Sequence, residues 1–404
     1  MIPNLNSYKK VIGAEKVKQI RQSAENLQDK HVVHINATSM GGGVAEILNS
    51  LVFLMNDIGI DTGWRVILGS HSFFNVTKKF HNFLQGKKGK VTANRKNIYL
   101  EYCKRNALIN HIKSHDAVIV HDPQPLGMIA NYEKKNNWIW RCHIDLSNPN
   151  NDALNFLLPY IKMYDGVIVS SEKFKIKSIE NPQIIIHPSI DPLSAKNKEI
   201  NKMKSKKILS SMGIDTDKPI ITQIGRFDPW KGHIGVIKMF KKIKEKMDCQ
   251  LIFMGDMAGD DPEGPILYHK IRQIAEKEGN SIVTITQNND LLVNILQRES
   301  SFIFQNSIRE GFGLTVAEAL WKKTPVIGTP AGGIPLQIIN GKTGYIIKDC
   351  NDGVKKAINL IEDKQLREEM GKAGHEHIKE KFLITRHLQD YINLLNKMYP
   401  PSTI

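Results

Sequence analysis

Short apolar runs alternate with longer amphipathic segments along most of this 404-residue chain. The short runs are rich in β-branched residues and predict buried strands, whereas the longer segments repeat their apolar residues at helical spacing. Strands that alternate with helices are typical of parallel sheets covered by helices on both faces, so the pattern predicts an α/β fold. The expected strands are 31–36, 117–121, 138–142 and 166–170 in the first half, and 219–225, 250–255, 281–285, 302–304 and 324–328 in the second.

A chain of this length is expected to form two domains of ordinary size, each with its own core. The polar, lysine-rich segment 194–207 predicts a linker between them. We therefore expect two Rossmann-like domains, an N-terminal one over 1–195 and a C-terminal one over 208–382. The amphipathic segment 383–404 is expected to pack back onto the first domain. Two such domains would face each other across a cleft near residues 41–43 and 226–231.

The most informative local signal lies between Glu310 and Glu318, two carboxylates eight residues apart. Residues 301–305 predict a strand and residues 314–321 a helix, so a glycine-rich turn joins the two. Free N–H groups at such a turn, together with the helix dipole, hold phosphate. Glu318 lies further along the helix, where it can reach a second part of the same ligand. A nucleotide-sugar fits this layout, with expected donor contacts from Glu310, Gly311, Phe312, Gly313, Leu314 and Glu318.

Two other loops that follow strands suit the anionic part of such a ligand. Arg226 and Lys231 follow the first strand of the second half, and two fixed cations at a strand end suit a diphosphate leaving group. Three consecutive glycines, 41–43, follow the first strand of the chain and allow close backbone approach to an anion. Their spacing is not that of the dinucleotide binders.

Two His-Asp pairs, in 121–125 and 141–145, end two strands of the first half. Ligands bind beyond the carboxyl ends of parallel strands, and polar side chains gathered there suit recognition of sugar hydroxyls. The expected acceptor contacts are Asp122, Gln124, Arg141 and Asp145. Cys142, next to His143, is expected to be a buried and unreactive thiol rather than a nucleophile.

The chain carries a net charge of +15, from 56 Lys and Arg against 41 Asp and Glu. The lysines are spread along helices and loops without a nucleic-acid motif, so nucleic acid is not an expected partner and a membrane surface is a minor alternative. Four scattered cysteines and the absence of a visible signal peptide or spanning segment predict a cytoplasmic protein with reduced thiols. We expect no metal site: the loop with Asp256, Asp260 and Asp261 is interpreted as solvated. A homodimer is compatible with the sequence.

Several longer strings are specific to one group of enzymes. The chain resembles the retaining glycosyltransferases of family four, which have the two-domain GT-B fold, and within them the trehalose glycosyltransferring synthases. The glutamate pair and the two cations follow that family's motifs in order and spacing. Gly232-His233 departs from the family pattern after Lys231, which puts the start of the next helix in doubt. The strings that narrow the resemblance are 120–125, 138–147, 188–194, 225–231 and 331–337.

The resemblance implies a role for each group of site residues. Arg226 and Lys231 would neutralise the diphosphate, with Gly42 and Gly43 as backbone donors. Glu318 would bind the ribose hydroxyls, and Glu310 would contact the donor sugar near its 3-hydroxyl. His143 would hold the donor glucose at its 6-hydroxyl and stabilise the reacting centre, while Asp122 would orient the acceptor. The expected catalytic residues are His143, Glu310, Arg226 and Lys231.

The expected reaction transfers glucose from an NDP-glucose, UDP- or ADP-glucose, to free glucose and forms α,α-trehalose. No carboxylate clearly opposes the leaving group, which favours same-face attack with retention over the double displacement of glycosidases. No cofactor is expected to be required, with Mg²⁺ at most stimulatory. The alternatives are a trehalose phosphorylase, a membrane-surface transferase for a lipid-linked acceptor, and a nucleotide-sensing module. The base preference stays open, with 286–290 as the candidate base loop.

Overall fold

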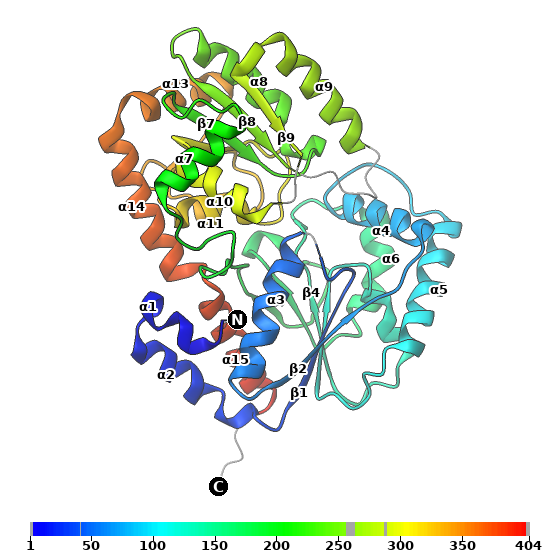
Figure 1. Ribbon diagram of the computed structural model, residues 1–404. Coiled ribbons are helices and arrows are strands. Elements are labelled where there is room, and N and C mark those ends of the chain that lie inside the picture. The colour runs from blue at the N-terminus through cyan, green and yellow to red at the C-terminus, as the bar shows by residue number, and fades with distance from the viewer. Residues whose placement is uncertain (1–2, 41, 256–262, 287–288, 401–404) are drawn as a thin grey trace. The chain divides into compact units, whose positions relative to one another are not determined.

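The computed structural model describes residues 3–40, 42–255, 263–286 and 289–400 (Figure 1). Contacts divide the chain into two compact units. The first unit comprises Met1–Ser189 and Leu383–Ile404, and the second unit comprises Ile190–Phe382. Each unit is an α/β body with its own sheet, as the alternating pattern predicts.

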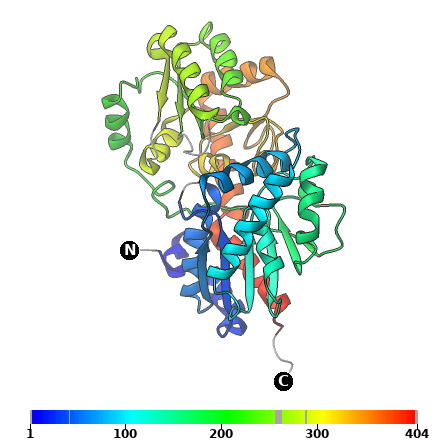
Figure 2. The ribbon, with the colours of Figure 1, turned by 90° about the vertical axis from the view of Figure 1, so that its right-hand side faces the viewer.

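The first unit is built on a parallel six-stranded sheet of order β2-β1-β3-β4-β5-β6. Helices cover both faces, with α4, α5 and α6 on one side and α3 and α15 on the other (Figures 1 and 2). The strands are β1 (His31–Asn36), β2 (Asp61–Val66), β3 (Ala117–His121), β4 (Asn137–Arg141), β5 (Gly166–Val169) and β6 (Gln183–Ile185). The α-helices are α1 (Lys9–Ile12), α2 (Ala14–Ser23), α3 (Gly43–Asp57), α4 (His71–Leu84), α5 (Ala93–Ile109), α6 (Asn151–Ile161) and α15 (Ile384–Met398).

The second unit repeats the plan with a parallel sheet of order β12-β11-β10-β7-β8-β9. Its strands are β7 (Ile220–Ile224), β8 (Gln250–Met254), β9 (Ile282–Ile285), β10 (Phe302–Gln305), β11 (Val326–Gly328) and β12 (Gly344–Ile346). Its α-helices are α7 (Lys202–Ser211), α8 (His233–Lys244), α9 (Glu263–Lys277), α10 (Asp290–Glu299), α11 (Leu314–Trp321), α12 (Ile334–Gln337), α13 (Cys350–Glu362) and α14 (Lys364–Lys381).

Each sheet forms a separate hydrophobic core. In the first unit Trp138 and Trp140 are fully buried on β4 among aromatic residues of α4 and α5. In the second unit Phe302 and Phe304 of β10 pack with Phe240 of α8. Burial of a large apolar side chain contributes about 1.5–3 kcal/mol, so these positions fix both sheets and place the strand ends that carry the polar groups.

The segment 194–207, predicted to be a linker, lies within the second unit. Residues 194–198 form hydrogen-bonded turns, and α7 begins at Lys202, capped by the Asn201 side chain. Asn197 is 3% exposed, and its amide donates to Asp191 O and to Ser194 Oγ. Buried and paired polar groups hold this segment against the second unit, a property that a lysine-rich composition does not reveal.

The doubt about the helix after Lys231 is resolved by Gly232. This glycine adopts a left-handed conformation (φ 68°) and caps α8, which begins at His233. The His233 ring is buried and stacks on Phe227 with 5.3 Å between centroids. Burial lowers the pKa of His233 to about 4, so the ring packs as a neutral aromatic group.

Candidate active site

The loop after β7 carries the two predicted phosphate cations. Asp228 accepts a hydrogen bond from the Trp230 N–H at 2.9 Å, and Gln223 donates to the Lys231 carbonyl at 2.7 Å. These bonds fix the loop at the carboxyl end of the strand. The exposed Arg226 guanidinium makes no hydrogen bond or ion pair with the described part of the chain. Arg226 is therefore an accessible cation at the strand end, while Lys231 is engaged.

Lys231 contacts Glu310, the other predicted catalytic residue of this unit. Its Nζ lies 2.6 Å from Glu310 Oε2, which also accepts from Gln305 at 3.0 Å and from Ser307 at 2.9 Å. Burial raises the pKa of the Glu310 carboxyl, but the ammonium and the two neutral donors outweigh it and leave the pKa below its ordinary value. The carboxylate is thus ionised at neutral pH, and the structure brings two predicted functional charges into direct contact.

The glycine turn between Glu310 and Glu318 contacts a second loop, which contains Gly332 and Gly333. Gly313 (φ 81°) caps α11, and the Gly333 N–H donates to the Gly311 carbonyl at 3.1 Å. A Cβ on Gly332 would lie 1.6 Å from the Glu310 carbonyl oxygen, so only glycine permits this approach. Phe312 is buried at 5% exposure. The string 331–337, which contributes to the resemblance, thus supports the backbone of the glutamate motif.

Glu318 lies on α11 and is 4% exposed. Its Oε2 accepts from Gln297 Nε2 at 3.1 Å, and its Oε1 lies 3.9 Å from Lys196 Nζ. Glu318 is therefore a held carboxylate in the second unit, as Glu310 is, with a different set of donors.

In the first unit the glycine loop after β1 is open. Gly42 caps α3 with φ 82°, and a Cβ built on it would meet no atom within 4 Å. Gly41 lies outside the described residues. Gly42 is exposed and Gly43 half-buried, so the start of α3 offers backbone N–H groups next to free space.

Three histidines form a hydrogen-bonded row across the sheet of this unit. His34 Nδ1 lies 2.9 Å from His121 Nε2, and His121 Nδ1 lies 3.0 Å from His143 Nε2. Burial lowers the pKa of all three, to about 3 for His34, and nearby Arg141 lowers it further for His121 and His143. The three rings are therefore neutral, and each has one donor and one acceptor nitrogen.

The row has a preferred direction. His34 Nε2 is buried and has no hydrogen-bond partner among the described residues. An unpaired buried acceptor is tolerated better than an unpaired buried N–H. This favours protons on Nδ1 of His34 and His121, so that His143 Nε2 accepts and the proton of His143 lies on its own Nδ1.

Asp122 adopts a strained backbone conformation next to this row. Its φ of 61° is one of two positive values at non-glycine positions in the described chain. Its Oδ1 accepts from the His143 N–H at 2.8 Å, and its carbonyl accepts from Trp140 Nε1 at 2.9 Å. Burial raises the pKa of Asp122 to about 6, against the opposing effect of the His143 N–H and Arg141. Asp122 thus couples the ends of β3 and β4.

The four predicted acceptor residues differ in exposure. Asp122 and Gln124 are partly exposed, whereas Asp145 is 3% exposed and Arg141 is fully buried. Arg141 donates to the Ile186 carbonyl at 2.8 Å, and its Nε and Nη1 have no partner in the described chain. In this conformation Arg141 acts on the site through its charge, as in its effect on His143, and presents no surface to a ligand.

Sequence reasoning missed six polar residues of these clusters. Gln305 ends β10 and Ser307 follows it, so the strand-end rule identifies them in retrospect. His34 is a polar residue inside an apolar strand, which is also a usable signal. Lys196, Gln297 and Lys322 give no local signal, because their partners lie far away in the sequence.

Within the described residues, no group of three or more His, Cys, Asp or Glu could hold a metal ion. Asp256, Asp260 and Asp261, the carboxylates of the predicted solvated loop, lie outside the described residues. The candidate base loop 286–290 is likewise described only in part, since 287 and 288 fall outside. Cys142 is fully buried, and burial raises the pKa of its thiol well above the ordinary value, as expected of an unreactive cysteine.

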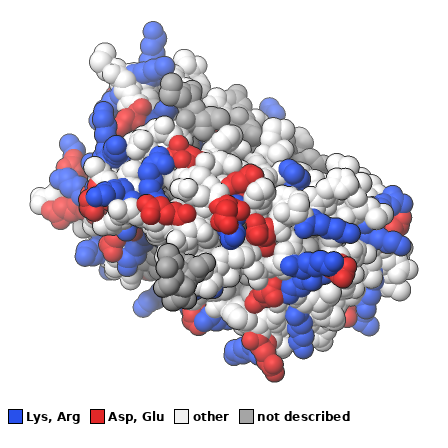
Figure 3. Space-filling view, turned by 90° about the horizontal axis from the view of Figure 1, so that it is seen from below, with Lys and Arg blue, Asp and Glu red and all other residues white. Residues whose placement is uncertain are grey.

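The surface shows no single concentration of charge on the face in Figure 3. Lysine and arginine are interspersed there with aspartate and glutamate. Within the described residues, no helix combines the length and apolar character needed to span a bilayer.

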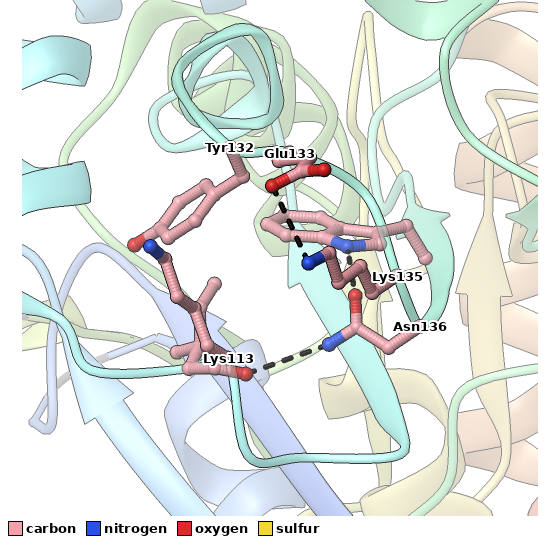
Figure 4. Close-up of a pocket in the computed structure, with 7 residues that line it drawn as sticks. Lys113, Tyr132, Glu133, Lys135 and Asn136 are labelled. Carbon is pink, nitrogen blue, oxygen red and sulfur yellow. Dashed lines mark hydrogen bonds and ion pairs between the residues drawn. The ribbon is translucent and has the colours of Figure 1, made fainter.

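A small pocket of about 60 Å³ lies in the first unit, at the end of the sheet opposite to the histidine row (Figure 4). Lys113 precedes β3 and Asn136 precedes β4, so the pocket is at the amino ends of these strands. It is separate from the clusters described above, which are at the carboxyl ends.

Two family models match the chain. One, described as the N-terminal domain of trehalose synthase, matches residues 34–176, and one described as glycosyl transferases group 1 matches residues 204–377. A trehalose synthase of Thermococcus litoralis is 49% identical over 97% of this chain and 96% of its own length. A trehalose phosphorylase of Pleurotus pulmonarius is 26% identical over 94% of this chain and 59% of its own length.

A solved structure, the sucrose-phosphate synthase from Thermosynechococcus elongatus, superposes with a TM-score of 0.71 at 16% identity. The match covers 92% of this chain and 100% of that chain. At this identity the likeness bears on the fold alone, and it identifies the GT-B arrangement of two parallel-sheet α/β domains.

Proposed function

The chain belongs to the trehalose synthase family of glycosyltransferases, and from that premise we propose that it makes α,α-trehalose. In this proposal it transfers glucose from UDP- or ADP-glucose to free glucose with retention at the donor carbon. The observation that carries the proposal is the contact between Lys231 and Glu310. The loop that carries Lys231 also exposes Arg226.

The second unit is the proposed donor side. Arg226 and Lys231 would neutralise the diphosphate as its charge grows, since fixed cations stabilise a departing anion. Glu310 is ionised and held by three donors, so it offers a fixed acceptor for a sugar hydroxyl. Glu318 would accept from the ribose hydroxyls. The positive charge of the two side chains supports a reaction without an added cofactor; full activity in excess EDTA is the expected result.

The first unit supplies the proposed acceptor side. His143, in the same unit, would hold the donor glucose at its 6-hydroxyl: it is a neutral imidazole whose pKa is well below its ordinary value, so it can bind a hydroxyl without adding positive charge. The acceptor would be oriented by Asp122, whose carboxyl already accepts from the backbone of His143. Gly42 and Gly43 would add backbone donors toward the donor phosphates. Small molecules are the only partners that the proposal needs, and we place the enzyme in the cytoplasm.

The proposed chemistry is same-face substitution. The acceptor oxygen bonds to the anomeric carbon on the face that the leaving diphosphate departs from, as the bond between that carbon and the phosphate oxygen breaks. The acceptor proton passes to the departing phosphate oxygen. Glu310 is committed to Lys231, Gln305 and Ser307, which favours a binding role over that of a covalent nucleophile. Positioning and leaving-group stabilisation then carry the catalysis.

One experiment tests the product. UDP-, ADP- and GDP-glucose are screened by thermal shift, and the stabilising donors are then incubated with glucose and followed by proton NMR. The expected product is α,α-trehalose with release of the nucleoside diphosphate. A β-linked product, or no transfer to free glucose from any donor, would overturn the assignment.

Paired variants separate the two sides. Asp122→Asn keeps a residue that tolerates a positive φ, and should impair acceptor use while nucleotide binding stays near wild type. Glu318→Gln should do the reverse and weaken the nucleotide about tenfold or more, because a charged acceptor is lost. Equal effects of both variants on nucleotide affinity would contradict the division of roles.

A phosphorylase is the second candidate, favoured by the 26% identity to the Pleurotus enzyme. A phosphorylase would release glucose 1-phosphate from trehalose with inorganic phosphate and no nucleotide. We expect no such product. Its formation at a rate comparable to nucleotide-dependent transfer would select the phosphorylase.

A further inference from the structure

A buried lysine lies at the C-terminal end of α11, one helical turn after Glu318. Lys322 follows α11 and is 6% exposed. Its ammonium donates to Asn197 Oδ1 at 2.6 Å, to Gln297 Oε1 at 2.7 Å and to the Glu318 carbonyl at 3.1 Å. A lysine ammonium has three donors and no acceptor, so these three oxygens satisfy it completely.

The contact with Lys322 fixes the direction of the Gln297 amide. Gln297 is fully buried, and its Oε1 faces the ammonium. Its Nε2 therefore faces the other way and donates to Glu318 Oε2 at 3.1 Å and to the Thr315 carbonyl at 3.4 Å. A reversed amide would set its NH₂ against the ammonium and its carbonyl against the carboxylate. Both contacts would be repulsive, so Lys322 determines which end of the amide Glu318 meets.

The two oxygens of Glu318 then have different roles. Oε2 is held by Gln297, whereas Oε1 lies 3.9 Å from Lys196 Nζ, beyond ordinary hydrogen-bond distance. The carboxylate is thus held through Oε2, while Oε1 has the Lys196 ammonium at 3.9 Å and no hydrogen bond from the described residues.

We propose that Lys322 is a positioning residue for the sugar donor: through Gln297 it holds Glu318 so that Oε1 meets the ribose hydroxyls of a nucleoside diphosphate. This rests on the proposed function, in which Glu318 binds the ribose. Lys322 itself touches no substrate, and its effect passes through two hydrogen bonds.

The charge of Lys322 makes the arrangement sensitive to pH. Burial lowers the pKa of Lys322 to about 7; Glu318 and Glu199 raise it, and Arg298 and Lys196 lower it. As the pH rises through this value, the Lys322 ammonium loses a proton and one hydrogen-bond donor. Its charge then no longer holds the Gln297 amide with Oε1 toward Lys322. Nucleotide affinity is therefore expected to be full below about pH 7 and to decline above it.

The test compares nucleotide binding by wild type, Lys322→Met and Lys372→Met. Lys372 lies exposed on α14 and makes no hydrogen bond or ion pair with the described residues, so it is the matched control. UDP and ADP are titrated calorimetrically at pH 6.5 and 8.5, and donor and acceptor KM are measured for the product-forming reaction. Gln297→Met breaks the same connection at its middle and replaces Lys322→Met if that variant does not fold.

We expect Lys322→Met and Gln297→Met to weaken nucleotide binding about tenfold at pH 6.5, the loss of one charge-assisted contact. Donor KM should rise while acceptor KM stays, and the pH dependence of wild type should disappear. In a Glu318→Gln background, Lys322→Met should add little, because the two residues act through one contact. Lys372→Met should match wild type throughout.

Two other results are informative. If Glu318→Gln weakens the nucleotide but Lys322→Met and Gln297→Met bind it like wild type, the positioning role is wrong and the proposed function stands. If wild type binds neither UDP nor ADP, the proposed function fails, and the role of Lys322 fails with it.

Discussion

One buried polar cluster in each unit shows a different state of charge. In the first unit, His34, His121 and His143 are neutral, because burial lowers the pKa of each ring and, among the described residues, no carboxylate hydrogen-bonds to the imidazoles. In the second unit, Glu310 stays ionised because Lys231 and two neutral donors surround one of its oxygens. The histidine row of the first unit thus depends on hydrogen bonds between neutral rings, whereas the Lys231–Glu310 contact of the second unit depends on paired charge.

The difference fits the chemistry proposed for the two clusters. Sugar hydroxyls are uncharged, and the neutral His143 imidazole matches them. A departing diphosphate is strongly anionic, and fixed positive charge stabilises it. The Lys231 ammonium is paired with Glu310 before a ligand arrives, which keeps it in place at a moderate desolvation cost. Variants that change the state of charge in one unit sharpen this comparison.

The largest expected effect is that of Lys231→Ala. Removing the ammonium leaves Glu310 buried with only neutral donors, so we expect kcat to fall roughly a hundredfold or more and stability to fall by about 3 kcal/mol. Steady-state kinetics and urea unfolding measure both. Glu310→Gln added to Lys231→Ala should recover stability but not activity. Near wild-type kcat in Lys231→Ala would remove the leaving-group role.

Acid should affect the Lys231–Glu310 pair only at low pH. The pKa of Glu310 is lowered in the folded state, so its contribution to stability is present above the unfolded value of about 4.5 and is lost as the pH falls through the lower folded value. Loss of the Lys231→Ala effect on stability at pH 6 would contradict this assignment.

Gly332→Ala should have the next largest effect. The new Cβ would lie 1.6 Å from the Glu310 carbonyl, and the residue has a φ of 52°, so both overlap and backbone strain oppose it. The matched control is Gly341→Ala, where φ is 78° and no atom lies within 4 Å. We expect the control to lose about 1 kcal/mol and Gly332→Ala at least about 2 kcal/mol more, with activity reduced about tenfold. If urea unfolding shows equal losses of stability for the two variants, the loop of Gly332 can move away from Glu310 at no cost.

Gly42→Ala tests the open glycine loop before α3, with Gly13→Ala as the control. Gly42 (φ 82°, ψ 158°) and Gly13 (φ 85°, ψ 155°) have nearly the same conformation, both cap helices, and neither would place a Cβ within 4 Å of another atom. Both variants should lose the same stability, about 2 kcal/mol, from strain alone. Only Gly42→Ala should weaken donor binding, by several-fold in calorimetry, because the backbone N–H groups lie at the proposed phosphate site. Equal donor affinities would exclude that site.

The smallest effect is expected for His34→Phe and depends on pH. The unfolded state protonates His34 below about 6.5, whereas the folded ring, with a pKa of about 3, stays neutral. Stability from this group is present above pH 6.5 and is lost as the pH falls, by about 1.4 kcal/mol between pH 7.5 and 5.5. Urea unfolding of His34→Phe should show an acid loss smaller by this amount. His111→Phe, at an exposed ring, is the control, and identical pH slopes for the two variants would show that His34 titrates in the fold.

Local pattern determined the secondary structure that places the site. Apolar runs predicted the central strands, and the helix expected at 314–321 is α11 in the structure. The edge strands β2, β6 and β12 were not predicted. Strands β2 and β6 are partly exposed, so their apolar pattern is weaker, and β12 has only three residues. Strand-end polarity also selected Lys231, Glu310 and His143, which the structure places in polar clusters, since the ends of parallel strands meet at one edge of a sheet.

Tertiary structure alone decided which of these polar residues contact one another. Lys231 and Glu310 are 79 positions apart, His34 and His121 are 87 apart, and Lys322 and Asn197 are 125 apart. Periodicity reports which face of an element is buried, but it carries no information about which distant side chain completes a hydrogen bond there. The sequence by itself therefore determined the two α/β units and the residues at their strand ends. The register of parallel strands and the packing of loops decided which charges are paired, which rings are neutral, and which oxygen of Glu318 accepts a hydrogen bond from Gln297.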